Sequence, residues 1–376
     1  MDNRTTTPLA KNTPRIWLVI GEKIGDNAQV IMIADALGLP YEIKRLLPLP
    51  EFEKGKPHFR ISLEHLDPAR SDALVPPWPD LVITVGRRHS MAALWIKQQS
   101  PDTRLVLIGR PRRWIDRFDL VVTLPQYSVP DLPNVMRLSL PLMRTDKTAV
   151  QAAAQNWEAR LQALPRPLIA VLIGSATRPF RFDGRTTEAL LRQCRELQAR
   201  NGGTLYFSTS RRTSAAIVET LKSDLPPGSQ LFEWRADSPD NPYLALLQLA
   251  DGFIVTGDSV SMMIEVADCG KPLAIFALPT GRISHIWQTI TRRLHAAPAP
   301  GIANRLFRAL GRLLYRTGIV GFSRDLTRIH DALMKGGFAV RCGEDFNTPP
   351  ADGLPDERLP VRRRILSLLG RQDADA

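Results

Sequence analysis

Small, hydroxyl-bearing and acidic residues gather where an apolar run gives way to a helical pattern. In Val255–Pro272 the run ends at Gly-Asp-Ser, and a helix is expected to start at once. The free amides of a first helical turn and the helix dipole attract anions, and Ser259 and Ser261 add hydroxyls. Glu265, one turn after Ser261, can accept hydrogen bonds from both hydroxyls of a ribose. We therefore expect Asp258 to Glu265 to bind a nucleoside diphosphate; the alternative is a plain strand–helix join capped by Ser259.

Two more loops of the same half carry residue types that suit phosphate. One follows the apolar run Leu168–Ile173 and the other follows Thr204–Ser208. Small residues let the backbone approach a phosphate, and guanidinium groups pair with its oxygens. The carboxyl ends of parallel strands meet at one edge of a sheet, where α/β proteins bind ligands. We therefore add to the donor site Gly174, Ser175, Ser210, Arg211, Arg212 and Thr213.

The first half offers candidates for an acceptor site. The turn Gly21–Gln29 has neither the G-x-G-x-x-G spacing nor that of a P-loop, so it favours neither dinucleotide nor ATP binding. Asp26 is interpreted either as a general base facing a cleft or as a helix N-cap. A basic stretch follows the run Leu81–Val85. Its arginines suit the binding of an acceptor phosphate, and its histidine suits a general base. The alternative is that these side chains are solvated or structural. The acceptor candidates are Lys23, Gly25, Arg87, Arg88 and His89.

These loops are expected on two α/β domains, because short apolar runs alternate with helical patterns through most of the chain. Such alternation is typical of parallel sheets covered by helices on both faces. The predicted fold is two Rossmann-like domains with parallel sheets facing a cleft. The predicted segments are a flexible start (1–14), an acceptor domain (15–143), a linker helix (144–166), a nucleotide-sugar domain (167–280), a basic helical region (281–345) and a mobile tail (346–376).

The composition of the chain indicates which classes of partner it binds. The net charge of +12 favours polyanions such as anionic lipid or phosphorylated small molecules, and no nucleic-acid motif accompanies it. A helix over 303–317 is predicted to be amphipathic, with leucines on one side; it rests either on an anionic membrane or on the fold with its arginines outward. The arginines of its basic face are Arg305, Arg308, Arg312 and Arg316.

Other compositional features bear on location and metal chemistry. No run of eighteen apolar residues exists, and the polar start lacks a secretory core, so we expect a cytoplasmic protein, with the inner membrane face as a peripheral site. Three scattered cysteines predict neither a disulfide framework nor a zinc site. The one Asp-x-Asp pair, Asp373-Ala-Asp375, is in the tail, so no metal and no cofactor is expected.

The chain resembles a family of plant "elongated mitochondria" fission factors and their bacterial relatives. The resemblance covers about two-thirds of the chain and is carried by the loops above, together with Asn241-Pro-Tyr243 and Gly270-Lys-Pro272. It implies a GT-B-like fold with a uridine-diphosphate-sugar type of donor site in the second half. Relatives carry a Pro-Glu-His-Asp type of turn after the run Leu120–Thr123, where this chain has Leu124-Pro-Gln-Tyr-Ser128.

These observations predict a metal-independent glycosyltransferase that moves a sugar from a nucleoside diphosphate to a lipid or surface-glycan acceptor. One alternative is a non-catalytic GT-B-like scaffold at a membrane surface, since the resemblance implies members that recruit a division GTPase. Another is an epimerase acting on the same donors. Because the turn at Pro125-Gln126-Tyr127-Ser128 differs from that of the relatives, both the glycosyltransferase and the non-catalytic scaffold stay open.

Overall fold

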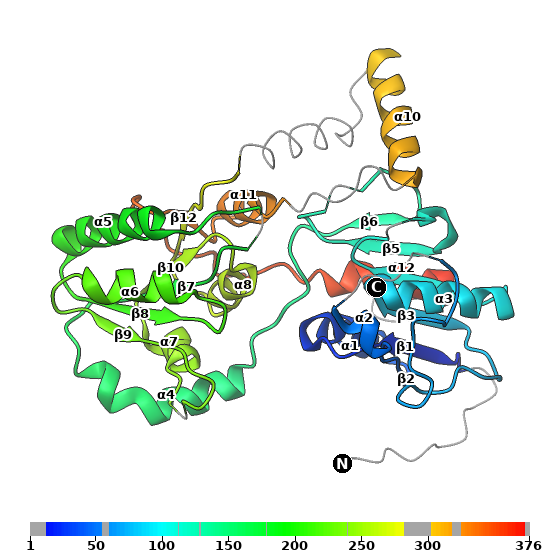
Figure 1. Cartoon of the computed structure of the whole chain (residues 1–376), viewed down its shortest axis with the longest axis horizontal. Helices are drawn as coiled ribbons and strands as arrows, with labels where there is room; N and C mark the ends of the chain where they lie inside the picture. Colours follow the sequence, from blue (N-terminus) through cyan, green and yellow to red (C-terminus); the bar gives the residue numbers. More distant parts are fainter. Residues whose placement is uncertain are drawn as a thin grey trace. The chain divides into compact units, whose positions relative to one another are not determined.

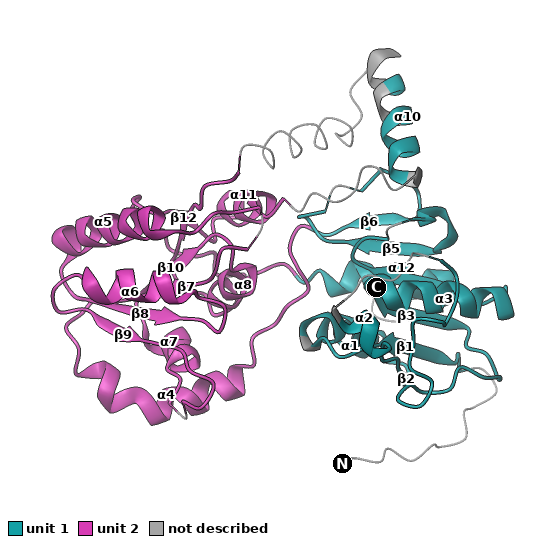
Figure 2. Cartoon of the chain, viewed as in Figure 1, with its two compact units in different colours: residues 1–138, 291–322, 356–376 teal, residues 139–290, 323–355 magenta. Residues whose placement is uncertain are grey.

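The computed structural model describes residues 13–54, 60–111, 113–127, 129–177, 179–238, 240–281, 302–317 and 325–372. The chain divides into two compact units (Figures 1 and 2). Unit 1 takes its described residues from 1–138, 291–322 and 356–376, and unit 2 from 139–290 and 323–355. Each unit contains one six-stranded parallel sheet.

In unit 1 the strand order is β2-β1-β3-β4-β5-β6. The inner strands are apolar and buried at nearly every position, because helices cover both faces of the sheet. The strands are β1 (Ile16–Ile20), β2 (Glu42–Arg45), β3 (Leu81–Val85), β4 (Arg104–Ile108), β5 (Leu120–Thr123) and β6 (Val135–Arg137). The helices are α1 (Ile24–Leu37), α2 (Pro50–Lys54), α3 (Arg87–Gln99), α10 (Ile302–Thr317) and α12 (Arg358–Leu368).

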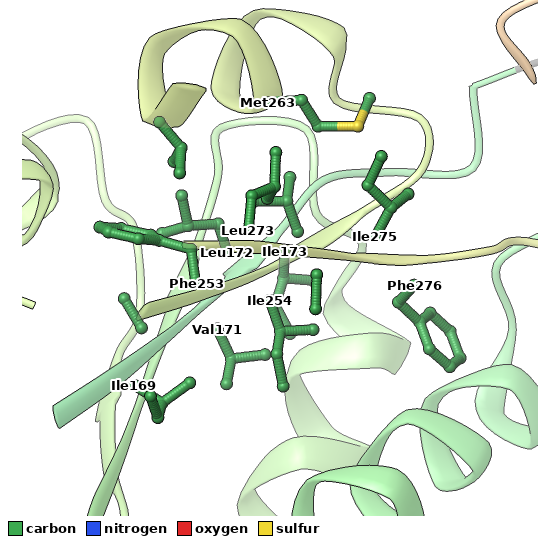
Figure 3. Close-up of a cluster of buried hydrophobic side chains, with 14 of the residues drawn as sticks. Ile169, Val171, Leu172, Ile173, Phe253, Ile254, Met263, Leu273, Ile275 and Phe276 are labelled. Atoms are coloured by element: carbon green, nitrogen blue, oxygen red, sulfur yellow. The ribbon is translucent and has the colours of Figure 1, made fainter. Parts of the chain in front are cut away.

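In unit 2 the order is β12-β11-β10-β7-β8-β9, which is the doubly wound Rossmann order. Its core lies between β7, β10, β11 and the helices that cover them, and Figure 3 draws Val171, Ile254 and Ile275 with Met263 of α8. The strands are β7 (Leu168–Ile173), β8 (Thr204–Thr209), β9 (Gln230–Phe232), β10 (Gly252–Thr256), β11 (Leu273–Phe276) and β12 (Val340–Arg341). The helices are α4 (Lys147–Gln162), α5 (Gly184–Asn201), α6 (Ala215–Ser223), α7 (Tyr243–Leu249), α8 (Val260–Asp268) and α11 (Thr327–Lys335).

The predicted α/β class with two Rossmann-like parallel sheets is confirmed. Two of the predicted boundaries differ from the structure. The helix predicted as a linker, α4, belongs to unit 2, because Val150, Trp157 and Leu161 are buried in the core of that unit. The first segment of unit 1 ends at Leu138 rather than at residue 143. The predicted cleft between the two sheets stays a prediction.

The C-terminal part of the chain also differs from the prediction. The basic region expected over 281–345 does not form one body, since α10 belongs to unit 1 whereas α11 and β12 belong to unit 2. The tail expected to be mobile contains α12, which packs against α1 and buries Val361, Ile365 and Leu366. The predicted flexible start, 1–14, lies almost entirely outside the described residues, and so does Asp373-Ala-Asp375.

Candidate functional site

The carboxyl edge of the unit 2 sheet has its switch point between β7 and β10. β7 pairs with β8 on one side and with β10 on the other, and all are parallel. The chain leaves β7 towards β8 and leaves β10 towards β11, so the two loops diverge from a common crevice. Ligands of open α/β sheets bind at such a crevice.

A buried carboxylate joins the two loops of this crevice. Asp258 is 4% exposed, and its Oδ2 accepts a hydrogen bond from the Ser175 amide at 2.7 Å. Its Oδ1 accepts one from the Thr256 hydroxyl at 2.9 Å, and Thr256 Oγ1 accepts one from the Gly174 amide at 2.8 Å. A Cβ at Gly174 would lie 2.1 Å from Ser259 Oγ, so only glycine fits at this position. Burial raises the pKa of Asp258 above its ordinary value.

This network changes the predicted role of the first loop. The amides of Gly174 and Ser175 were expected to face a phosphate, but they already donate to Thr256 and Asp258. Ser259 is the N-cap residue of α8, as the alternative predicted, yet its side chain makes no capping bond and lies 3.4 Å from Asp258 Oδ2. The carboxylate therefore stands near the start of α8, where the helix dipole favours a negative charge.

The loop after β8 is tied to the same edge. Thr213 Oγ1 accepts a hydrogen bond from the Ser210 amide at 2.9 Å and lies 2.8 Å from the carbonyl of Gly174, to which it can donate. The structure thus brings together the three loops that the sequence predicted on one edge. Arg211 and Arg212 are exposed and form no ion pair with any residue that the structure describes. Arg212 also exerts an electrostatic effect on Asp258 that opposes the burial effect on its pKa.

Glu265 lies on the second turn of α8, one turn after the half-buried Ser261. Its Oε2 accepts a hydrogen bond from the hydroxyl of Tyr243, the first residue of α7. Burial raises the pKa of Glu265, and the hydrogen bond from Tyr243 acts in the opposite direction. Both side chains are half-buried, so Tyr243 fixes the direction of a carboxylate that still meets solvent. Tyr243 has no predicted role, although Asn241-Pro-Tyr243 is among the motifs that carry the family resemblance.

A second residue without a predicted role supports the β10 loop. His330 of α11 is buried, and its Nε2 lies 2.7 Å from the carbonyl of Gly257. Its ring stacks on Phe180 with an interplanar angle of 10°. Burial lowers the pKa of His330, so the neutral ring is favoured. No pattern near Gly257 points to a partner so far along the chain.

In unit 1, the β1–α1 turn is closed by Asn27 rather than by Asp26. The Asn27 amide donates to the carbonyl of Gly21 at 2.7 Å, and its Oδ1 accepts from the Gly21 amide at 3.3 Å. Helix α1 begins at Ile24 with Lys23 as the N-cap residue, so the interpretation of Asp26 as the cap is wrong. The Asp26 side chain is 42% exposed and lies 3.9 Å from Lys23 Nζ. Gly25 is exposed on the same first turn.

The basic stretch after β3 is largely occupied with structural bonds. His89 Nδ1 lies 3.0 Å from the carbonyl of Val85, and Nε2 lies 3.3 Å from that of Leu46. Burial lowers the pKa of His89, and its ring fills the space where Gly21 has no side chain. The interpretation of His89 as a base is therefore replaced by the structural one.

The two arginines of this stretch differ in their contacts. Arg88 Nη2 donates to the carbonyls of Phe52 and Glu53, at 3.1 Å for the latter, because α2 ends beside it. That side chain closes α2, and the prediction that it binds phosphate is not supported. Arg87 is half-buried on the first turn of α3.

Two further features bear on chemistry. Among the residues that the structure describes, no three His, Cys, Asp or Glu side chains gather closely enough to hold a metal ion.

In the turn after β5, Gln126 is 3% exposed, and its Oε1 has no hydrogen-bond partner in the described part of the chain. Ser128 lies outside that part.

Comparison with known proteins gives two curated relatives. An uncharacterised protein of Rickettsia prowazekii is 26% identical over 300 residues, covering 70% of this chain and 83% of the relative. The mitochondrial fission protein ELM1 of Arabidopsis thaliana is 27% identical over 220 residues, covering 52% of this chain and 51% of the relative. The matched region thus spans about half of the plant protein.

A solved structure with a similar trace is UDP-GlcNAc 2-epimerase from Methanocaldococcus jannaschii. It is 10% identical, with a TM-score of 0.44, and the match covers 95% of this chain and 99% of that one. The family described as mitochondrial fission ELM1 matches residues 24–307, well over half of the sequence. The chain therefore belongs to the mitochondrial fission ELM1 family.

Proposed function

We propose that unit 2 binds the diphosphate and ribose of a sugar nucleotide, and that the protein transfers the sugar to a lipid or surface-glycan acceptor without a metal ion. The observation that carries this proposal is the joined set of loops after β7, β8 and β10, beside which Arg211 and Arg212 are exposed without an ion-pair partner among the described residues. Paired guanidinium groups at the ligand-binding edge of a Rossmann-type sheet suit a diphosphate.

The diphosphate lies on the solvent side of Asp258 in this proposal. That carboxylate holds the amide of Ser175 and stands near the start of α8, so a phosphate cannot occupy the same position. The phosphate oxygens instead meet Arg211, Arg212 and the hydroxyl of Ser261. Positive charge from these arginines stabilises the diphosphate as it leaves the sugar, which is the part a metal ion plays in other sites.

The ribose is held by Glu265. A carboxylate accepts hydrogen bonds at two oxygens, and Tyr243 already fixes Oε2. The second oxygen, together with the remaining lone pair of Oε2, is available for the two ribose hydroxyls. Because the carboxylate is half-buried, such bonds are screened less than they would be at the surface.

The acceptor group remains assigned to unit 1. Asp26 keeps its predicted role as the base, since its carboxylate is exposed on the first turn of α1 and does not cap the helix. Arg87 keeps its predicted role at an acceptor phosphate. Arg88 and His89 are left out, because their side chains hold the backbone of neighbouring segments.

A non-catalytic scaffold is the second candidate, and one observation favours it. The turn Leu124–Tyr127 carries no carboxylate and no imidazole, and Gln126 is buried there. This turn therefore lacks both side-chain types, carboxylate and imidazole, that enzymes use most often as a general acid or base. A scaffold of this kind keeps the nucleotide site and has no turnover.

Thermal unfolding of the full chain against a panel of sugar nucleotides tests the proposal. Binding at a hundredfold excess over the dissociation constant stabilises the folded state by about 2.7 kcal/mol. We expect Arg211→Gln and Arg212→Gln to weaken this effect singly, whereas Arg192→Gln, an exposed arginine on α5, leaves it unchanged. Donor hydrolysis or transfer supports the enzyme, binding without turnover supports the scaffold, and release of an epimerised sugar supports the third alternative. A panel that gives no stabilisation contradicts nucleotide binding.

A further inference from the structure

The positive charge of the chain is concentrated in one segment. Between residues 282 and 324 the sequence has eight arginines and no aspartate, glutamate or lysine. The excess in this stretch is two-thirds of the net charge of +12. The described part of the segment is α10, which carries Arg305, Arg308, Arg312 and Arg316 without an acidic residue. Nothing on the helix itself neutralises them.

Helix α10 also exposes its leucines. Leu306, Leu310 and Leu313 are 67%, 47% and 58% exposed, and they recur at the spacing of one helix face. Three of the five large hydrophobic side chains that stand exposed among the described residues are on this helix. An amphipathic helix ordinarily buries its apolar face against its own domain. This face is left uncovered by the rest of the described chain.

The helix is attached to unit 1 by its opposite side. Tyr315 is 1% exposed, and its hydroxyl donates to the carbonyl of Pro111 at 2.6 Å. At 3.6 residues per turn, Tyr315 lies about 180° around the helix from Leu306. The leucine row therefore points away from the attachment, and the exposed Arg305 and Arg312 lie on one flank between the two. In Figures 1 and 2, α10 projects from unit 1 beyond β6.

We propose that α10 is an interfacial anchor that binds an anionic lipid bilayer. Leu306, Leu310 and Leu313 enter the boundary between headgroups and acyl chains, and Arg305 and Arg312, both exposed, pair with lipid phosphates. Apolar side chains flanked by arginine without any carboxylate match such a surface in both hydrophobicity and charge. A second copy of the chain fits less well, because a second α10 adds four more arginines and no carboxylate that could pair with them.

The length of the helix agrees with a position in the plane of the membrane surface. Sixteen residues in α10 make a helix of about 24 Å, and its polar flank and its attachment through Tyr315 keep one side with the protein. No helix in the described part of the chain combines the length and the hydropathy needed to cross a bilayer.

The test is flotation of the full chain with vesicles of phosphatidylcholine, with and without phosphatidylglycerol. We expect binding only to the vesicles with phosphatidylglycerol. Changing Leu306, Leu310 and Leu313 together to Gln should weaken it by roughly a hundredfold, because three apolar contacts are lost. Arg305→Gln with Arg312→Gln should weaken it by roughly thirtyfold in low salt and little in high salt. Val75→Gln with Leu359→Gln, two equally exposed apolar residues elsewhere, is the matched control and should bind as the unchanged chain does.

A second measurement keeps the proposal testable if the triple variant unfolds. A polarity-sensitive dye on Leu310→Cys should become brighter when vesicles containing phosphatidylglycerol are added. Unchanged dye fluorescence, failure of the unmodified chain to float, or full binding by a folded triple variant would overturn the proposal. So would a dimer that the leucine changes convert to a monomer in the absence of any vesicle binding, since that result assigns the face to a second copy.

Discussion

Replacing Tyr243 by Phe removes one hydroxyl and leaves the ring in place. That hydroxyl donates to Glu265, so the carboxylate loses a hydrogen bond to a charged acceptor. Such bonds contribute about 1.5–3 kcal/mol, and because Glu265 is half-buried, water replaces part of the loss. We expect the free energy of unfolding of unit 2 to fall by about 1–2 kcal/mol at a pH where Glu265 is ionised.

The loss should depend on pH in a direction set by Glu265. Burial already raises the pKa of Glu265, and removal of the Tyr243 hydroxyl raises it further. A carboxyl with a raised folded-state pKa contributes its full stability below the ordinary pKa and loses it as the pH rises through the folded value. The free energy of unfolding of the variant should therefore lie further below that of the unchanged chain at about pH 8 than at about pH 5.

Urea unfolding, monitored by hydrogen exchange of the β10 amides, measures this loss. Strand β10 belongs to unit 2, so its amides report on the stability of that unit alone. A double-mutant cycle with Glu265→Gln isolates the pairwise coupling. Equal losses at both pH values, or effects of Tyr243→Phe and Glu265→Gln that add within about 0.5 kcal/mol, would show that the two side chains are not coupled.

Three other changes test separate parts of the structure. Gly174→Ala should lower the stability of unit 2 by about 2–3 kcal/mol in urea unfolding, because the new Cβ would lie 2.1 Å from Ser259 Oγ; Gly25→Ala, which has nothing within 4 Å, is the control and should cost nothing. Asp258→Asn removes a carboxyl whose pKa burial raises, so the stability of the unchanged chain relative to the variant should fall as the pH rises from about 4 to 7; a constant difference would contradict the raised pKa. Tyr315→Phe should reduce the stability of unit 1 by about 1 kcal/mol in urea unfolding, since it deletes a buried hydrogen bond to Pro111, and an unchanged midpoint would contradict the attachment of α10.

The central strands were predictable because their sequences are continuous apolar runs. β1, β3, β7 and β10 all fall on such runs, which are buried on both faces of a parallel sheet. The edge strands β6, β9 and β12 were not predicted. They have two or three residues and are partly exposed, so no periodicity marks them. Helix α7 was missed for a similar reason, since its seven residues are too few for a helical pattern to stand out.

The candidate site was predictable to the level of its loops but not of its bonds. The rule that ligands meet the carboxyl ends of parallel strands correctly placed Gly174, Thr213 and Asp258 on one edge. It did not reveal that Thr256 and Asp258 already accept the hydrogen bonds of the Gly174 and Ser175 amides at that edge. Tyr243 and His330 reach the site from helices distant in sequence, and a local pattern carries no information about such contacts.

The sequence correctly predicted the helical spacing of α10 but did not predict what its leucines contact. A repeat of leucine and arginine at helical spacing predicts an amphipathic helix whether the leucines meet a core or a membrane. The exposure of Leu306, Leu310 and Leu313 shows that these leucines do not meet a core within the described chain. The side chains of Arg308 and Arg316, which were part of the same prediction, lie outside the described residues.

A crystal of the full chain soaked with uridine diphosphate tests the central claim most directly. We predict electron density for both phosphates beside Arg211 and Arg212 near the start of α8, and ribose hydroxyls within hydrogen-bonding distance of Glu265. An empty edge at a concentration that saturates binding in solution, or a nucleotide bound elsewhere with Glu265 paired only to Tyr243, would contradict it.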